Sequence, residues 1–284
     1  MTTGKRQVAV LERGRFRVLA LDMDGTLAGA DGRVSQRAIT ALGRAERAGL
    51  HVVIVTGRAV PTPLAVWRAA GLSAPLIACG GALTIQPPGL EALDVRPLPE
   101  HLVVEALDLG TRLELVVSLW TQTEIWVTRR GPIAEMLSAL NDLDVLEIDR
   151  LANHVPRAPV LKVMLGGEPA TVDRAEADIL AGLAGATASR SMRESLEATA
   201  ANASKEQALE AVLRRLGVAP EQVIAAGDAD NDLGMLRMAG FAIVPGDAMA
   251  GPRAAADLVV GPHHADGVAE FIDAFLDDLV RLGT

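Results

Sequence analysis

The chain contains one cysteine, Cys79, and no tyrosine among its 284 residues. A single cysteine excludes an internal disulfide. No apolar run approaches the roughly 20 residues that a membrane-spanning helix needs, and residues 1–15 lack the apolar core of a signal peptide. These absences predict a cytoplasmic protein that does not cross a membrane.

Basic residues are also scarce. Lys and Arg number 27 against 36 Asp and Glu, which gives a net charge of −9. A nucleic-acid partner favours a basic balance, so the charge argues against one. Half of the residues are apolar and 22% are charged, which is typical of a globular protein rather than a disordered one. The length suits one large domain or two modest ones.

Strands and helices alternate at both ends of the chain, and a different pattern separates them. Buried strands are predicted at 18–21, 51–56 and 76–79 with helices between them, which indicates parallel βαβ units. Ser35 is expected to cap the first of these helices. The turn-rich segment 86–89 (QPPG) breaks this rhythm, which returns at Ser204. Between them, strands at 113–120 and 124–128 with a short link predict an antiparallel hairpin. The last predicted helix runs from about 267 to 282. We therefore expect an α/β fold: a doubly wound, mostly parallel, Rossmann-like core and an inserted α+β cap. The predicted ranges are 1–85 and 199–284 for the core and 86–198 for the cap.

The first predicted strand ends in two aspartates that are one residue apart. The run 18–21 (VLAL) is typical of a buried parallel strand, and Asp22 and Asp24 follow at its carboxyl end. Open α/β sheets bind ligands at that end. Two carboxylates and a flexible turn suit Mg²⁺ and phosphoryl chemistry, because one acid can be the nucleophile and the other a proton donor.

Three further signals follow, each at a predicted strand end or helix start. Residues 56–58 (TGR) offer a hydroxyl and backbone N–H groups that can hold a phosphate oxygen. Lys205, in the first turn of a helix capped by Ser204, can pair with phosphate and with a carboxylate. Residues 227–232 (GDADND) form a second acidic loop, and oxygen ligands of this kind suit Mg²⁺.

These signals, in this order, make the chain resemble the haloacid dehalogenase-like hydrolases, and in particular the Cof-type phosphatases with a type IIB cap. The resemblance covers nearly the whole chain and includes residues 235–240 (MLRMAG) and 266–269 (DGVA). It implies Mg²⁺-dependent hydrolysis of a small phosphorylated metabolite. Sugar phosphates, polyol phosphates and a phosphorylated flavin precursor are the phosphomonoesters that it suggests.

The resemblance also implies a role for each motif residue. Asp22 would attack phosphorus to form an aspartyl-phosphate, and Asp24 would protonate the leaving alcohol and then deprotonate the hydrolytic water. Mg²⁺ would be held by Asp22, the backbone carbonyl of Asp24 and Asp228, while Asp232 would bind or orient the metal's waters. The residues expected to hold the transferring phosphoryl group are Thr56, Gly57, Lys205 and Asn231.

Three positions depart from the pattern of that subfamily. Gly80 stands where asparagine is common, Glu206 follows the motif lysine in place of glycine, and Asp247 replaces the asparagine of a Gly-Asn-Ala segment. None of these changes removes a predicted catalytic residue. They affect the expected substrate contacts and the geometry of the loops.

Other functions fit parts of the pattern. A phosphomutase shares the nucleophile but passes the phosphoryl group to a second hydroxyl rather than to water. A receiver-type phospho-acceptor also gathers acids, a threonine and a lysine at strand ends, but it is compact, so the long insert disfavours it. A non-catalytic sugar-phosphate binder is disfavoured because the acidic residues and Lys205 are intact.

Several conspicuous residues have a structural interpretation beside the functional one. A buried strand-end position is favoured for Cys79, and a loop rather than a metal site for His263 and His264, since adjacent side chains face different ways. Trp120 and Trp126 either pack the cap sheet or touch substrate. Structural roles are also favoured for Asp230 and for three arginines that could instead grip a second anionic group, Arg129, Arg130 and Arg190.

Overall fold

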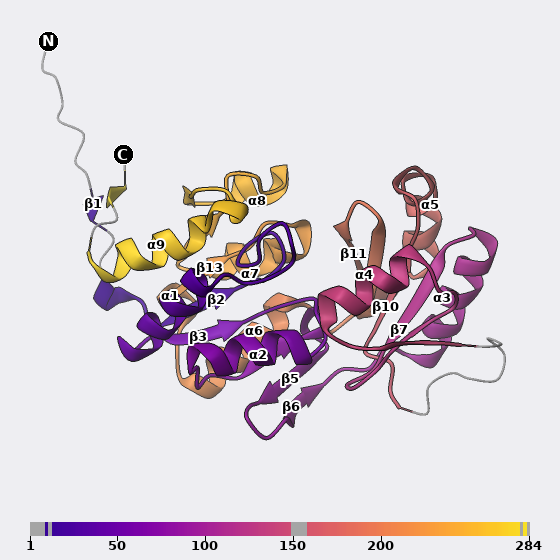
Figure 1. Cartoon of the computed structure of the whole chain (residues 1–284), viewed down its shortest axis with the longest axis horizontal. Coiled ribbons are helices and arrows are strands. Elements are labelled where there is room, and N and C mark those ends of the chain that lie inside the picture. Colours follow the sequence, from indigo (N-terminus) through magenta and orange to yellow (C-terminus); the bar gives the residue numbers. More distant parts are fainter. Residues whose placement is uncertain (1–8, 11–12, 149–157, 279–280, 283–284) are drawn as a thin grey trace, which may run out of the picture.

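The computed structural model describes residues 9–10, 13–148, 158–278 and 281–282. Two α/β bodies lie side by side, one built around a parallel sheet from both ends of the chain and one from its middle (Figure 1). This arrangement confirms the predicted fold class. Within the described ranges, no helix is both long and apolar enough to cross a membrane.

The central sheet is parallel and has the order β15-β14-β13-β2-β3. Alternate residues of β2 face opposite cores: Leu19 and Leu21 pack in one apolar cluster, Val18 and Ala20 in another. Helices therefore cover both faces, as the doubly wound prediction requires. The strands of this sheet are β2 (Val18–Leu21), β3 (His51–Ile54), β13 (Val223–Ala226), β14 (Phe241–Val244) and β15 (Leu258–Val259).

Register places the functional loops together. Leu21 at the end of β2 lies opposite Ala226 of β13 and Ile54 of β3, so these strands end at the same level. The loops that follow them, with the predicted motifs, meet at one edge of the sheet.

Two helices of the core begin at the predicted caps. Ser35 accepts a hydrogen bond from the backbone N–H of Ala38, and Ser204 accepts one from Gln207. The sequence predicts a last helix that reaches Leu282, but α9 ends at Leu276. The core helices are α1 (Gln36–Arg47), α2 (Pro61–Ala70), α6 (Lys205–Leu216), α7 (Leu233–Met238), α8 (Ala250–Ala255) and α9 (Gly267–Leu276).

Short strands extend the core at its margins. Arg281–Leu282 forms β16, which pairs with β1 (Ala9–Val10) in place of the expected end of the last helix. An antiparallel ribbon, β4-β5-β6, joins the central sheet through a parallel bridge between Val55 and Ile77. Its strands are β4 (Leu76–Ala78), β5 (Leu83–Gln86) and β6 (Glu91–Val95).

The middle of the chain forms a second sheet of order β11-β12-β10-β7-β8-β9, antiparallel except between β8 and β9. The predicted hairpin is present, but its first strand starts at Val116 because the preceding helix continues through Arg112. The parts of the predicted core and cap that fall on residues 1–8, 11–12, 149–157, 279–280 and 283–284 lie outside the described residues. The strands are β7 (Val116–Trp120), β8 (Ile125–Val127), β9 (Val145–Glu147), β10 (Lys162–Gly166), β11 (Ala186–Met192) and β12 (Ser195–Ala200).

Helices of the middle segment divide between two apolar clusters. α3 (Glu100–Arg112) and α5 (Pro169–Gly182) pack on one face of the second sheet. α4 (Pro132–Asn141) joins the apolar cluster that also contains residues of β2 and α2. This helix therefore docks the second body against the first beside the functional loops.

Candidate active site

The loops after β2 and β13 interlock at the edge of the central sheet. Gly25 has φ of +71°, and a Cβ there would lie 2.3 Å from Oδ2 of Asp228, so only glycine lets the two loops approach this closely. Next to it, the Thr26 hydroxyl donates to Oδ1 of Asp228 at 3.1 Å. The DMDGT segment thus positions the second acidic loop as well as its own aspartates.

Lys205 links residues that are far apart in the sequence. Its Nζ lies 2.6 Å from Oδ1 of Asp22 and 2.7 Å from Oδ1 of Asp232, and all three side chains are buried. The other oxygen of Asp232 accepts from the backbone N–H groups of Asp228 and Ala229 at 3.1 Å each. The structure therefore brings together Asp22, Lys205, Asp228 and Asp232 as the sequence predicted.

The charges of this cluster perturb each other. Burial raises the pKa of Asp22 well above its usual range, Lys205 opposes the rise, and Asp232 and Asp228 add to it. Burial and Asp232 also raise the pKa of Asp228 to about 6. Burial works to lower the pKa of Lys205, but the adjacent Asp22 and Asp232 outweigh it and hold that pKa well above its ordinary value. Lys205 is therefore an ammonium among carboxylates that it does not fully neutralise.

This cluster fits a divalent cation. Carboxylate oxygens of Asp22, Asp228 and Asp232 lie within 4.8 Å of one another, and hard oxygen donors suit Mg²⁺. Burial and the neighbouring Asp232 both raise the pKa of Asp228, and a cation bound at this carboxylate would offset both effects. Asp232 already accepts from Lys205 and two backbone N–H groups, so Asp22 and Asp228 have more freedom to bind a metal directly.

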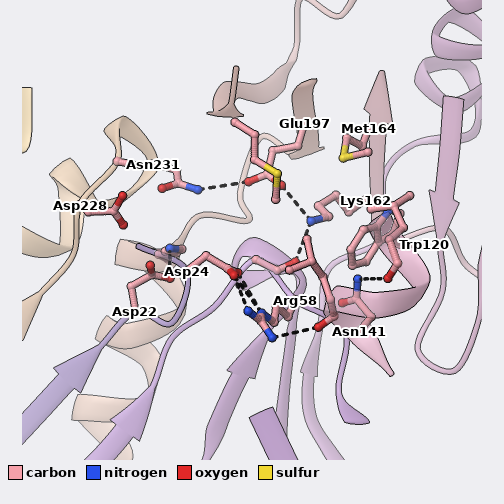
Figure 2. A pocket seen from close by; sticks show the side chains of 16 residues that line it. Asp22, Asp24, Arg58, Trp120, Asn141, Lys162, Met164, Glu197, Asp228 and Asn231 are labelled. Atoms are coloured by element: carbon pink, nitrogen blue, oxygen red, sulfur yellow. Dashed lines mark hydrogen bonds and ion pairs between the residues drawn. The ribbon is translucent and has the colours of Figure 1, made fainter. Parts of the chain in front are cut away.

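Asp24 faces a partner that the sequence did not reveal. Arg58 donates to both carboxylate oxygens of Asp24, from Nε at 3.1 and 3.0 Å and from Nη2 at 2.5 Å (Figure 2). The buried guanidinium also donates to the backbone carbonyls of Gly32 and Leu140 at 2.7 and 2.9 Å. Since Leu140 lies in the last turn of α4, Arg58 ties the Asp24 loop to the second body.

A second ion pair approaches the same place from the second sheet. Lys162 of β10 lies 2.8 Å from Oε2 of Glu197 of β12, and both side chains are buried. The ammonium also donates to the carbonyl of Gly57 at 2.7 Å and lies 3.8 Å from the centre of the Trp120 ring. Glu197 accepts from Nδ2 of Asn231 at 3.2 Å. This pair thus contacts two of the predicted phosphate-binding loops.

Asn231 has an unused polar atom at this place. Its Oδ1 is buried and has no hydrogen-bond partner among the residues that the structure describes. Burial works to raise the pKa of Glu197, but Lys162, Lys205 and Asn231 outweigh it and lower that pKa, so Glu197 stays ionised. A buried acceptor without a partner costs free energy, so Asn231 Oδ1 marks a position where a donor from a ligand would be stabilised.

A cavity opens between these groups (Figure 2). Of the Thr56-Gly57 pair, only Gly57 is among the described residues that line it, while the buried Thr56 hydroxyl accepts from the backbone N–H of Arg58. One end of the cavity is lined by Asp22, Asp24, Asp228 and Lys205. The other end is lined by the second body, through Trp120, Leu137, Leu140, Asn141, Lys162, Met164, Met192 and Glu197.

The structure also places four residues for which the sequence allowed either a structural or a functional role, Trp120, Trp126, Cys79 and Arg190. Trp120 lines the cavity, whereas the indole of Trp126 donates to Glu124. Cys79 is buried, which raises its pKa to about 11 and keeps it a thiol. Arg190 pairs with Asp173 and Glu176.

The three departures from the subfamily pattern also have structural settings. Gly80 has φ of +67°, which glycine adopts without strain and asparagine tolerates, so the backbone accepts either. Glu206 lies in the first turn of α6 against Gly234, where its charge suits the helix dipole. Asp247 contacts His263.

Comparisons with known proteins agree with this geometry. Residues 19–272 match the family model of the haloacid dehalogenase-like hydrolases. The phosphoglycolate phosphatase of Natronomonas pharaonis is 29% identical over 268 residues, covering 92% of this chain and 98% of that protein. Pyridoxal phosphate phosphatase YbhA of Escherichia coli is 26% identical over 296 residues, covering 92% of this chain and 98% of that protein. The crystal structure of a haloacid dehalogenase-like hydrolase from Bacteroides thetaiotaomicron has the same fold, with a TM-score of 0.80 and 24% sequence identity. The match covers 91% of this chain and 98% of that one.

Proposed function

The chain belongs to the haloacid dehalogenase-like hydrolases, and from that premise we propose that it hydrolyses a small phosphomonoester with Mg²⁺, through an aspartyl-phosphate on Asp22. One observation carries the proposal: Lys205 holds Asp22 at the end of β2, beside Asp228 and at the wall of a cavity. The similar proteins named as phosphatases support the same reaction class.

The first step belongs to Asp22. Its carboxylate oxygen attacks phosphorus, the ester P–O bond breaks, and the electron pair leaves with the alcohol oxygen. Two anions must approach each other in this step, so positive charge has to offset their repulsion. Lys205 supplies one charge at 2.6 Å from Asp22. Mg²⁺, held by Asp22, Asp228 and the carbonyl of Asp24, would supply the rest.

Asp24 would move the protons. It donates a proton to the departing alcohol oxygen and then takes one from the water that attacks the aspartyl-phosphate, which releases inorganic phosphate and restores Asp22. Arg58 fixes the carboxylate of Asp24 at the cavity wall through both oxygens. The contact supports the placement of Asp24 beside the leaving group, and for the acid step one of its oxygens would have to leave Arg58 and carry the proton.

The phosphoryl oxygens would be bound by Gly57, Lys205 and Asn231, with Thr56 supporting the loop through its bond to Arg58. Asn231 would reach a phosphoryl oxygen through Nδ2, which here donates to Glu197, whereas its buried Oδ1 is an acceptor and suits a hydroxyl of the substrate. The far end of the cavity combines Trp120, a Met and Leu wall, and the Lys162–Glu197 pair. That mixture suits a compact leaving group with an apolar side and a few polar groups, as in phosphates of small metabolites.

Phosphate release tests the proposal. The purified protein is assayed with p-nitrophenyl phosphate and with a panel of sugar phosphates, polyol phosphates, phosphoglycolate, pyridoxal phosphate and a flavin-precursor phosphate, with Mg²⁺ or with EDTA. We expect turnover with Mg²⁺, loss with EDTA and loss in Asp22→Asn. Asp230→Asn is the matched control, because Asp230 is an exposed acid of the same loop as Asp228. Release by Asp22→Asn at the wild-type rate would refute the nucleophile.

The same assay separates hydrolysis from phosphoryl transfer to a sugar. A phosphomutase returns the phosphoryl group to a second hydroxyl, so a sugar monophosphate primed with its bisphosphate would isomerise rather than release phosphate. We expect release of inorganic phosphate in step with substrate loss and no isomer.

A further inference from the structure

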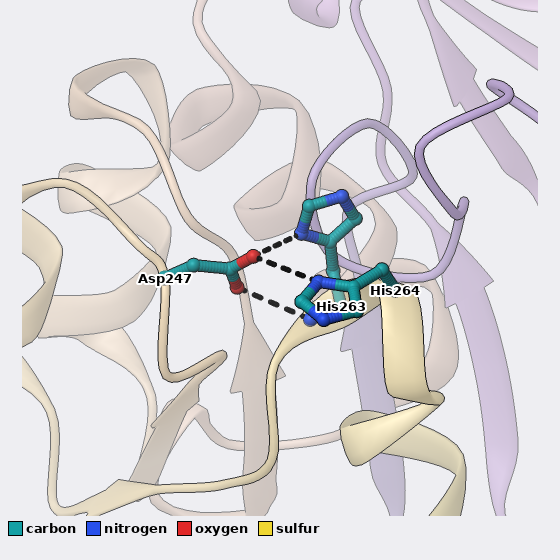
Figure 3. A group of neighbouring side chains, drawn as sticks. All are labelled: Asp247, His263 and His264. Carbon is teal, nitrogen blue, oxygen red and sulfur yellow. Dashed lines mark hydrogen bonds and ion pairs between the residues drawn. The ribbon is translucent and has the colours of Figure 1, made fainter.

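Two features of the sequence that the proposed reaction does not use lie in contact in the structure. Asp247 replaces the asparagine of the subfamily pattern, and His263 and His264 are adjacent in the sequence. Asp247 lies in the loop after β14, while the two histidines begin a short 3₁₀ turn, His263–Ala265, that precedes α9. Figure 3 shows both imidazoles turned toward the carboxylate of Asp247, contrary to the expectation that they would face different ways.

The contacts are close and come from two separate loops. Oδ2 of Asp247 lies 2.6 Å from Nδ1 of His263 and 3.5 Å from Nδ1 of His264. Oδ1 of the same carboxylate accepts from the backbone N–H of His263 at 3.1 Å, which fixes the turn against the β14 loop. One nitrogen from each histidine and an oxygen of Asp247 lie within 4.8 Å of one another.

From this convergence we propose that Asp247, His263 and His264 bind a borderline transition-metal cation such as Zn²⁺, separately from the acidic cluster of the active site. A set of two imidazole nitrogens and one carboxylate oxygen suits Zn²⁺ and similar ions better than it suits Mg²⁺ or Ca²⁺. Three protein ligands leave a position for water.

Hydrogen bonding alone explains only part of the arrangement. The 2.6 Å contact between His263 and Asp247 is a good hydrogen bond, but the 3.5 Å contact of His264 is too long for one. Two ligands bound to one tetrahedral zinc at 2.0–2.2 Å lie roughly 3.3 Å apart. Zn²⁺ binding therefore requires the distance from Nδ1 of His263 to Oδ2 of Asp247 to lengthen from 2.6 Å, whereas the 3.5 Å distance from Nδ1 of His264 to the same oxygen changes little.

Tight packing around the histidine turn limits the movement of the proposed ligand residues. A Cβ on Gly267 would lie 1.9 Å from the carbonyl oxygen of Gly261, so the histidine turn passes tightly against the start of α9. α9 in turn packs along α1 through ion pairs of Arg44 with Asp273 and Asp277. A bound cation would tie the loop after β14 to α9, and so it would stabilise the folded chain by mass action.

Zn²⁺ binding to the Asp228→Asn variant tests the proposal, because this variant lacks one carboxylate of the active-site cluster. In Asp228→Asn, which weakens the active-site cluster, Zn²⁺ is titrated calorimetrically and Co²⁺ is added as a spectroscopic probe of nitrogen ligation. We expect one Zn²⁺ per chain, a rise in Tm with Zn²⁺, and cobalt absorption bands of a site with nitrogen ligands.

The matched variants are built in the same background. His264→Ala and Asp247→Asn should each weaken Zn²⁺ binding roughly tenfold or more and remove the Tm rise. His264 is 59% exposed, so its removal spares the fold. His101→Ala, which removes an exposed histidine of α3, should keep binding unchanged. Absence of Zn²⁺ binding in Asp228→Asn, or a Zn²⁺ affinity that His264→Ala and Asp247→Asn leave unchanged, would overturn the proposal without bearing on the proposed phosphatase reaction.

Discussion

At the scale of single residues, the acid role proposed for Asp24 predicts how different leaving groups are treated. Arg58 holds the carboxylate of Asp24 at the cavity wall. A general acid matters most when the leaving group is a poor one, because an alkoxide needs a proton and a nitrophenolate does not.

Asp24→Asn should therefore act selectively. We expect kcat/KM for an alkyl phosphate to fall roughly 100-fold or more, and that for p-nitrophenyl phosphate to fall clearly less. Steady-state kinetics on both substrates measure the ratio, with Asp230→Asn as the control. Equal losses on both substrates would count against the acid role.

The raised pKa of Asp228, about 6, gives a pH dependence. Protons compete with a bound cation for this carboxylate, so Mg²⁺ affinity should fall about tenfold from pH 7 to pH 5. In metal-free protein the folded state binds this proton more tightly than the unfolded chain does. Its contribution to stability is therefore fully present below pH 4 and is lost as the pH rises through 6.

Calorimetric Mg²⁺ titrations at pH 5, 6 and 7 measure the first effect. Metal-free melting curves over pH 4–7 measure the second, and Asp228→Asn should flatten this component. An Mg²⁺ affinity that stays constant between pH 7 and pH 5 would show that Asp228 is not a ligand.

Motif residues were the predictable part at this scale. Asp22, Asp228, Asp232 and Lys205 follow strand ends or begin a helix, so short-range patterns locate them. Arg58 was visible only as part of the TGR motif, because its partners, Asp24 and the Leu140 carbonyl, lie 34 and 82 residues away.

At the scale of elements, α4 connects the two bodies. Asn141 at its end is buried, and its Oδ1 accepts from the backbone N–H of Ala59 at 2.7 Å while its Nδ2 donates to the Leu137 carbonyl at 2.8 Å. The loop after β3 is thus held by the helix that also receives Arg58.

Removal of this side chain leaves a buried donor unpaired. Asn141→Ala should lower the free energy of unfolding by about 1–3 kcal/mol and weaken catalysis through the Arg58 loop. Urea unfolding and kcat/KM measure the two effects. Glu135→Ala, an exposed position of the same helix, is the control and should change neither. Stability of Asn141→Ala equal to that of the control would refute this account of the docking.

Elements were predicted well where local signals are strong. Ser35 and Ser204 cap helices as expected, and the apolar run of β2 is a buried strand. The prediction failed at the end of the chain, where helical periodicity continued past Leu276 but Arg281–Leu282 pairs with β1. Long-range pairing of that kind leaves little trace in a local pattern. The boundary of the cap at residue 86 stays a prediction, and β6 within that range pairs with β5.

At the scale of the whole molecule, the Lys162–Glu197 pair joins the second sheet to the loops that follow the strands of the central sheet. Lys162 contacts the Gly57 carbonyl and Glu197 contacts Asn231. Neither residue was singled out from the sequence. Their meeting depends on the register of β10 with β12 and with β7, which sets Lys162 opposite Thr199 and Trp120.

A double-mutant cycle tests the pair. Lys162→Met alone leaves a buried carboxylate without its cation, so it should cost about 3–5 kcal/mol of stability. Lys162→Met combined with Glu197→Gln should cost less than the sum of the single changes, with a coupling of at least about 1 kcal/mol. Denaturant unfolding measures the cycle, and KM reports the phosphate site. Additive effects would mean that the pair does not act as a unit.

The covalent step on Asp22 is the claim on which the proposed reaction depends, and chemical trapping tests it most directly. Turnover with Mg²⁺ and substrate is quenched in acid, borohydride reduces any acyl phosphate to homoserine, and peptide mass spectrometry locates it. We predict homoserine at position 22 in wild type and in Asp24→Asn, and none in Asp22→Asn. Phosphate release during the same turnover with no modification at Asp22, or with modification at another carboxylate, would contradict the account.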